Sequence, residues 1–152
     1  MAEWKKICCA VDFSEPSRLA MNEAADLARR FQADLTVLHV YEEPAAAVAA
    51  LEAPRLEHLE RAAGEIERKL SGWRSEAEAV ATRPVRSAML SGATAAEILR
   101  FVREGSFDLL VVGTHGRTGF KHLVLGSVAE RVVREADCTV LVPRRSAPAR
   151  NG

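Results

Sequence analysis

The sequence predicts an α/β fold: a single domain with a doubly wound, Rossmann-like parallel sheet of five strands and helices on both faces. Short apolar runs alternate with longer segments whose apolar residues recur every three or four positions. The apolar runs are nearly continuous, as in strands buried on both faces of a parallel sheet. No internal repeat or linker divides the 152 residues, a length that suits one domain with a substantial core.

The first predicted strand and helix lie near the N-terminus. Residues 6–11 are almost entirely apolar and form the strand. Ser14 is expected to cap the helix that follows, and Pro16 falls in its first turn, where the missing N–H costs little. The spacing predicts that this helix buries one face, made of Leu19, Ala20, Ala24, Leu27, Ala28 and Phe31.

The middle of the chain supplies two more strands and two more helices. Residues 35–40 are the second predicted strand, whereas residues 42–54 carry no helix cap and are assigned no element. Residues 84–90 are less hydrophobic, so we expect the third strand at an edge of the sheet. Thr94 is expected to cap the helix after it, which Gly105 ends. The longer helix between these strands starts near Pro54 and carries apolar residues at helical spacing: Leu56, Leu59, Ala63, Ile66, Leu70 and Trp73.

The last third of the chain completes the alternation. Residues 107–112 are the fourth predicted strand, and a loop with several glycines leads to a helix over residues 127–136. Residues 139–142 are the fifth strand, which Pro143 closes. We expect residues 1–145 to form the domain and residues 146–152 to form a flexible tail.

Composition and charge exclude several classes of protein. Lys and Arg together number 21, as do Asp and Glu, so no net field favours nucleic acid or an acidic membrane. The first apolar run is too short for a signal peptide or a membrane span. Cys8, Cys9 and Cys138 fall in predicted strands without Cys-x-x-Cys spacing, which favours buried reduced thiols. We therefore expect a cytoplasmic protein that binds neither nucleic acid nor membrane.

A glycine pattern follows the fourth predicted strand. Gly113 and Gly116 have Gly-x-x-Gly spacing, and nine residues separate Gly116 from Gly126 and Ser127 at the start of a helix. Glycines accept positive φ and let a ligand approach the main chain, while a helix N-terminus offers N–H groups and a positive dipole end. The pattern favours a phosphate site, although an ordinary strand-to-helix turn with helix caps has the same spacing. It is neither a Walker A loop nor a dinucleotide fingerprint.

Polar or glycine residues stand where three of the predicted strands end. Asp12 follows the first strand, the Val40 main chain ends the second, and Gly113 follows the fourth. The carboxyl ends of parallel strands share one edge of the sheet, and ligands bind there, where the strand order reverses. We therefore expect one crevice, with a base against Val40, a ribose near Asp12 and phosphates between Gly113 and Ser127.

These residues resemble the universal stress protein family over roughly residues 5–144. The likeness rests on residues 11–14 (Val-Asp-Phe-Ser), residues 38–40 (Leu-His-Val), and the run from residue 112 through Gly126 and Ser127 to residues 140–142. Family members that bind ATP keep Gly-x-x-Gly, nine residues and then Gly-Ser or Gly-Thr, as this chain does. The resemblance implies an adenine nucleotide alpha hydrolase-like sheet with strand order 3-2-1-4-5.

The same resemblance implies roles for particular residues. Asp12 would contact the ribose and the Val40 main chain the adenine, while Ala129 stands where some relatives offer another hydroxyl. Phosphates would lie against the glycines, His115, Ser127 and the Val128 amide, with any Mg²⁺ held through the phosphates. The residues expected to bind ATP are Ala10, Val11, Asp12, Ser14, Val40, Val112, Gly113, His115, Gly116, Arg117, Gly126, Ser127 and Val128.

Three functions stay open on the sequence alone. The first is a nucleotide-dependent regulatory protein of the stress response. The second is a slow ATPase or an enzyme that phosphorylates its own Ser127, for which Asp12, His115 and Ser127 are the one constellation that the sequence offers. The third is an interaction module that prefers AMP or cyclic AMP, or binds no nucleotide. The lack of a fuller catalytic constellation favours the first.

The last predicted strand and His39 are the subjects of the remaining expectations. The resemblance implies a homodimer whose last strands pair antiparallel, and Val140, Leu141 and Val142 form a short apolar strand that would pair as an edge. Burial of that strand within one monomer is the alternative.

His39 lies in an apolar strand and is expected to be a hydrogen-bonded core residue rather than a catalyst or metal ligand.

Overall fold

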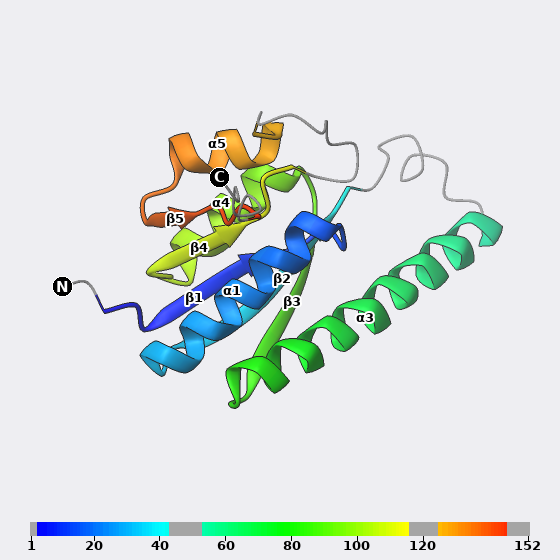
Figure 1. Ribbon diagram of the computed structural model, residues 1–152. Coiled ribbons are helices and arrows are strands. Elements are labelled where there is room, and N and C mark those ends of the chain that lie inside the picture. The colour runs from blue at the N-terminus through cyan, green and yellow to red at the C-terminus, as the bar shows by residue number, and fades with distance from the viewer. Residues whose placement is uncertain (1–2, 43–52, 116–124, 146–152) are drawn as a thin grey trace, which may run out of the picture.

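Five parallel strands form one sheet in the order β3-β2-β1-β4-β5, as expected, in a computed structural model that describes residues 3–42, 53–115 and 125–145 (Figure 1). The strands are β1 (Lys6–Ala10), β2 (Asp34–Tyr41), β3 (Val85–Ser91), β4 (Leu109–Val112) and β5 (Thr139–Leu141). The helices are α1 (Glu15–Phe31), α3 (Ala53–Ala81), α4 (Thr94–Glu104) and α5 (Ser127–Glu135). Strand β1 pairs with both β2 and β4, so the strand order reverses beside β1.

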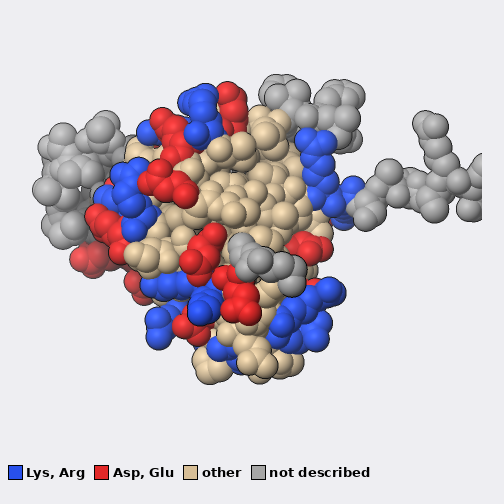
Figure 2. Space-filling view, turned by 90° about the vertical axis from the view of Figure 1, so that its left-hand side faces the viewer, with Lys and Arg blue, Asp and Glu red and all other residues tan. Residues whose placement is uncertain are grey.

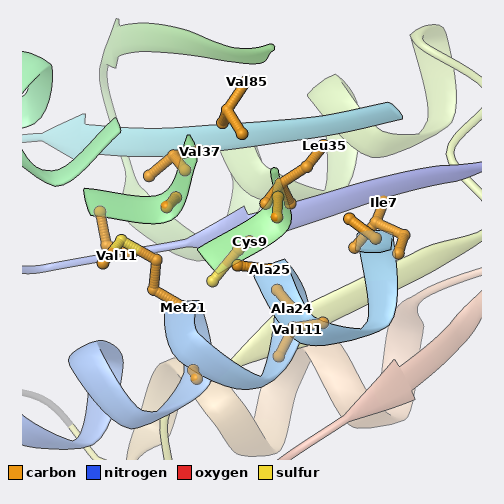
Figure 3. Packing of buried hydrophobic residues seen from close by; sticks show 14 of the residues in the cluster. Ile7, Cys9, Val11, Met21, Ala24, Ala25, Leu35, Val37, Val85 and Val111 are labelled. Atoms are coloured by element: carbon orange, nitrogen blue, oxygen red, sulfur yellow. The ribbon is translucent and has the colours of Figure 1, made fainter. Parts of the chain in front are cut away.

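The helices cover the sheet in two layers (Figure 1). One core lies beneath α1 and α3, where Ile7, Cys9 and Val37 pack against Met21 and the alanines of α1 (Figure 3). The other core lies beneath α4 and α5 and includes Cys8, Leu110 and Val132. Because successive residues of a strand face opposite sides, neighbouring Cys8 and Cys9 belong to different cores.

Helix α1 begins and packs nearly as its sequence predicts. Ser14 is its N-cap and accepts a hydrogen bond from the Ser17 N–H, and Pro16 lies in the first turn. Ala20, Ala24, Ala25 and Ala28 are fully buried, together with Met21. The expected face was wrong at its margins, because Leu19 is half-exposed and Phe31 is 43% exposed, packed edge-on against Trp4 at the rim of the sheet.

The structure confirms the predictions for two of the three cysteines and for the edge strand β3. Cys8 and Cys9 are buried thiols in β1, but Cys138 lies just before β5 and is half-buried. Burial raises the pKa of all three thiols. Strand β3 is at an edge, as its lower hydrophobicity predicts, and β5 is the opposite edge.

The surface carries interspersed charges of both signs. On the face seen in Figure 2, blue and red side chains alternate around a central uncharged area. Many Arg and Glu side chains pair one helical turn apart, as Arg131 does with Glu135 at 2.6 Å. Within the described ranges, no helix is long and apolar enough to cross a membrane. The predicted tail at residues 146–152 lies outside the described residues.

Candidate nucleotide site

A cavity of about 480 Å³ opens where β1, β2 and β4 end, beside the point at which the strand order reverses. Its walls come from the ends of these strands, from the first turns of α1 and α4, and from the start of α5. The residues that line it are Ala10, Val11, Asp12, Ser17, Leu38, Val40, Thr94, Ile98, Val112, Gly113, His115, Leu125, Gly126, Ser127, Val128 and Ala129.

The structure brings nearly all the expected nucleotide-binding residues to this one cavity. Of that set, Ser14 does not line the wall but donates from its N–H and its hydroxyl to the Asp12 carboxylate. Gly116 and Arg117 lie outside the described residues. For the whole expected set, contact with a nucleotide remains a prediction.

The N-terminus of α5 gives the cavity its main donors. Ser127, Val128 and Ala129 are the first three residues of α5, so their N–H groups have no partner within the helix. The residue before them is Gly126, which has no side chain to cap the turn. The cavity therefore receives both the backbone donors and the positive end of the helix dipole.

Gly113 and Gly126 do not have the positive φ angles that the sequence pattern suggested, and the angle at Gly126 is −63°. A Cβ at Gly113 would lie 2.9 Å from the Pro16 carbonyl carbon and from the Ser17 nitrogen, so this glycine allows β4 to end against the backbone of α1. The Gly126 N–H donates to the Thr114 carbonyl at 2.7 Å and is not among the donors that face the cavity.

The turn after β1 is held in a conformation that is uncommon for its residues. Phe13 has a φ of 65°, in the left-handed region that costs an aromatic residue about 1–3 kcal/mol. The other non-glycine residues with positive φ in the described part of the chain, Gln32, Thr82 and Ser106, lie within two residues of a helix C-terminus, where this conformation is common. Phe13 instead lies between Asp12, on the cavity wall, and the α1 N-cap.

Hydrogen bonds within this turn fix the Asp12 carboxylate and backbone. The Ser14 N–H donates to Asp12 Oδ1 at 3.0 Å, and the Asp12 N–H donates to Ser17 Oγ at 3.3 Å. His39 lies behind the turn, with Nδ1 2.7 Å from the Val11 carbonyl oxygen. The expectation that His39 is a hydrogen-bonded residue of its strand is confirmed, although it is half-buried rather than fully enclosed.

One wall of the cavity comes from α4, which the sequence analysis did not assign to the site. Thr94 and Ile98 line it from one face of the helix, four residues apart, and that spacing was available in the sequence. Leu38 likewise lies two residues before Val40 on the same face of β2. Thr94 was expected to be the α4 cap, but it is the first helical residue, and the cap position is Ala93.

The carboxylate of Glu42, the residue directly after β2, caps α4 in place of Thr94. Glu42 Oε1 accepts from the Thr94 N–H at 3.3 Å and from the Thr94 hydroxyl at 3.1 Å. Local sequence could not reveal this cap, since the two residues are 52 positions apart.

The cavity wall is largely apolar and carries little formal charge. Among the described residues that line it, Asp12 is the one carboxylate, and Lys and Arg are absent. Among the described residues that line the cavity, the positive end of the α5 dipole is therefore the feature that would attract an anion. Within the described part of the chain, no three His, Cys, Asp or Glu side chains gather as metal ligands.

Comparison with known proteins identifies relatives across the chain. A model of the Universal stress protein family matches residues 3–144. Universal stress protein MJ0531 of Methanocaldococcus jannaschii is 34% identical over 149 residues, which cover 93% of this chain and 83% of that protein.

Solved structures share the fold. UspA from Lactobacillus plantarum, a universal stress protein, has a TM-score of 0.84 at 26% identity and covers 95% of this chain and 100% of its own. A universal stress protein solved in complex with cAMP has a TM-score of 0.73 at 22% identity, with 95% of this chain and 100% of that chain covered.

Proposed function

Because the chain belongs to the universal stress protein family, we propose that it binds ATP in the cavity beside β1 and acts as a nucleotide-dependent regulatory homodimer of the cytoplasm in stress responses. One observation carries the proposal. The cavity, whose volume of about 480 Å³ is in the range of small-molecule sites, contains the N-terminus of α5, which no side chain in the described part of the chain caps.

The arrangement of the wall suggests how the ligand lies. The phosphates accept hydrogen bonds from the N–H groups of Ser127, Val128 and Ala129, at the positive end of α5. The ribose lies against Asp12 and the adenine against the Val40 main chain. The cavity supplies Asp12 as its one carboxylate, so a Mg²⁺ ion would take its ligands from the phosphates and water.

Dimerisation is proposed through strand β5. This strand is at an edge of the sheet, and Val140, Leu141 and Val142 are all half-buried in the single chain. An apolar edge strand leaves backbone N–H and C=O groups ready to pair with a second copy. Light scattering at micromolar concentrations should give the mass of a dimer, and a monomeric mass would refute this part of the proposal.

Calorimetric titration with ATP, ADP, AMP, cyclic AMP and GTP tests the ligand. We expect ATP to bind more tightly than GTP and AMP, because both an adenine wall and a phosphate site take part. The fold is shared with the protein solved with cAMP, so cyclic AMP is the first alternative. Tighter binding of cyclic AMP or AMP would overturn the ATP assignment. Failure of every nucleotide to bind would leave an interaction module.

The same sample decides between a regulator and a slow enzyme. The described part of the cavity holds no charge clamp of Lys or Arg and no group of metal ligands, which supports binding without rapid turnover. We expect release of phosphate from bound ATP to be no faster than in buffer. Phosphate release that is lost in Asp12→Ala and Ser127→Ala would favour the enzyme instead.

A further inference from the structure

The pairing of β1 with β2 ends at the wall of the cavity. The Val11 N–H donates to the Leu38 carbonyl at 2.8 Å, but the register ends at the pair of Ala10 and Leu38. In a parallel ladder the next bond would run from the Val40 N–H to the Val11 carbonyl. That bond is not formed, so the Val40 amide faces the place where β1 would have continued.

A side chain has taken the position of that missing bond. His39 Nδ1 is 2.7 Å from the Val11 carbonyl oxygen. A carbonyl oxygen only accepts, so Nδ1 carries the proton of this hydrogen bond. Val40 lines the cavity on one face of β2, and alternation along the strand places the His39 ring on the opposite face.

Aromatic packing holds the His39 ring in place. The Phe13 ring lies over it, with ring centroids 4.6 Å apart and planes inclined by 33°. Phe13 packs edge-on against Trp73 of α3 at 5.3 Å, and the Lys69 ammonium lies 5.3 Å from the Phe13 ring centre. Phe13 contributes this ring from the turn in which its φ is positive. The uncommon turn and the imidazole therefore support one another.

We propose that His39 is a positioning residue for adenine recognition: its imidazole takes up the Val11 carbonyl and thereby keeps the Val40 N–H out of the β-ladder and available to the base. The inference rests on the proposed function, because it assigns a ligand group to the Val40 amide. It explains why a polar ring lies behind the wall of the cavity, and why β1 ends at Ala10 although Val11 is also apolar and β-branched.

Two substitutions separate the hydrogen bond from the stacking. His39→Phe keeps an aromatic ring against Phe13 but removes the donor, so the Val40 N–H is expected to close onto the Val11 carbonyl. His39→Asn loses the ring but can place an amide N–H close to the position of Nδ1. Circular dichroism and thermal unfolding would establish that both variants fold.

The first measurement is hydrogen exchange of the Val40 amide in the nucleotide-free protein, followed by NMR. We expect ready exchange in the wild type and in His39→Asn, and slowed exchange in His39→Phe. The second is binding of ATP and of inorganic tripolyphosphate. His39→Phe should bind ATP about tenfold more weakly, whereas His39→Asn stays within about threefold of the wild type. Tripolyphosphate has no base, so its affinity should be the same in all three.

Each outcome bears on one proposal or the other. Equal ATP affinity in His39→Phe and wild type, or equal exchange at Val40 in all three proteins, would overturn the role of His39. A parallel loss of ATP and tripolyphosphate would mean that the substitution disturbs the whole cavity, which also overturns it. If the wild type binds tripolyphosphate but no adenine nucleotide, the proposed function fails, and the exchange data still decide whether His39 prevents the ladder from closing.

Discussion

The N-terminal ends of α4 and α5 both reach the cavity, but among the described residues only the α4 end is capped by a side chain. At α4, the Glu42 carboxylate accepts from both the N–H and the hydroxyl of Thr94. At α5, the residue in the capping position is Gly126, which has no side chain. A third helix, α1, is capped by Ser14. The contrast therefore lies between two helix ends that are capped by side chains and one, at α5, whose capping residue has none and where we propose that the phosphates bind.

This contrast teaches where a phosphate site can be sought in such a fold. Any helix N-terminus attracts an anion, so the dipole alone does not distinguish α4 from α5. What distinguishes them is that the carboxylate of Glu42, directly after β2, already occupies the α4 end. Substitutions can add a cap at α5 or remove the cap at α4. The following variants test these caps and the packing around them, from the largest expected effect to the smallest.

Gly126→Asp gives α5 the cap that α4 already has. The backbone at Gly126, with φ −63° and ψ 163°, is open to any residue, so the carboxylate can accept from the first-turn N–H groups. It would also repel the phosphates. We expect ATP affinity to fall roughly 100-fold, about 2.7 kcal/mol, while the free energy of unfolding rises by about 0.5 kcal/mol.

Gly72→Asp is the matched control for that substitution. Gly72 lies in the interior of α3, where a Cβ would meet nothing within 4 Å, and it adds the same charge away from the cavity. Calorimetric titration of both variants, with urea unfolding, makes the comparison. If Gly126→Asp bound ATP as well as Gly72→Asp does, the α5 N-terminus would not be the phosphate site.

Gly113→Ala tests the packing that places the α1 and α5 ends around the cavity. The new Cβ would come within 3.0 Å of the Pro16 and Ser17 backbone, and backbone atoms cannot give way as a side chain can. We expect a loss of about 2 kcal/mol in the free energy of unfolding, with weaker ATP binding. Gly72→Ala should instead stabilise α3 by about 0.5–1 kcal/mol. Urea unfolding measures both, and an unchanged stability for Gly113→Ala would contradict the close approach seen here.

Glu42→Ala removes the internal cap of α4. The two hydrogen bonds from Thr94 are lost, and we expect the free energy of unfolding to fall by about 1 kcal/mol. Glu42→Gln keeps an acceptor oxygen and should lose less. Urea unfolding of the two variants checks the order, and equal losses would show that the charge rather than the acceptor provides the cap.

Glu78→Gln is expected to have the smallest effect on the free energy of unfolding. Like Glu42, Glu78 has a carboxylate that accepts a hydrogen bond from a backbone N–H. Glu78 Oε1 accepts from the Val85 N–H at 2.9 Å, and this bond, together with Arg74, holds the pKa of Glu78 below its ordinary value of 4.5. A depressed pKa means that the contribution to stability is present above pH 4.5 and lost as the pH falls through the folded-state value.

Thermal unfolding of wild type and Glu78→Gln across that range measures this contribution. The gap between the two proteins should be widest near neutral pH and should narrow below pH 4.5. A gap that stays constant into acid would show that the Glu78 carboxylate is not stabilised by Val85.

The sequence predicted the fold more fully than the site. Strand order, edge position of β3 and the Ser14 cap follow from short-range patterns and from the family likeness, and the structure confirms them. Strand ends were less predictable. Val11 and Val142 are apolar and β-branched and were expected in strands, but β1 and β5 end one residue earlier.

Contacts between distant segments explain what the sequence could not reveal. The cap on α4 requires Glu42, from the end of another strand, and Gly113 serves the approach of α1 rather than a positive φ. Gly126 was expected at the phosphates, but its N–H donates to the Thr114 carbonyl, a contact that the glycine spacing does not predict. Gly116 and Arg117, two of the residues expected at the phosphates, lie outside the described residues.

Four buried alanines of α1 hold this helix close to the sheet, and substitutions at them would disturb the cavity from a distance. Ala20, Ala24, Ala25 and Ala28 leave no space between helix and sheet, so a bulkier residue at any of them lifts α1. The backbone at Pro16 and Ser17, against which Gly113 fits, would move with it. A relative with larger residues at these positions would then lose the proposed nucleotide site while every residue around the cavity stayed the same. The four alanines are therefore worth comparing among relatives together with the glycine motif.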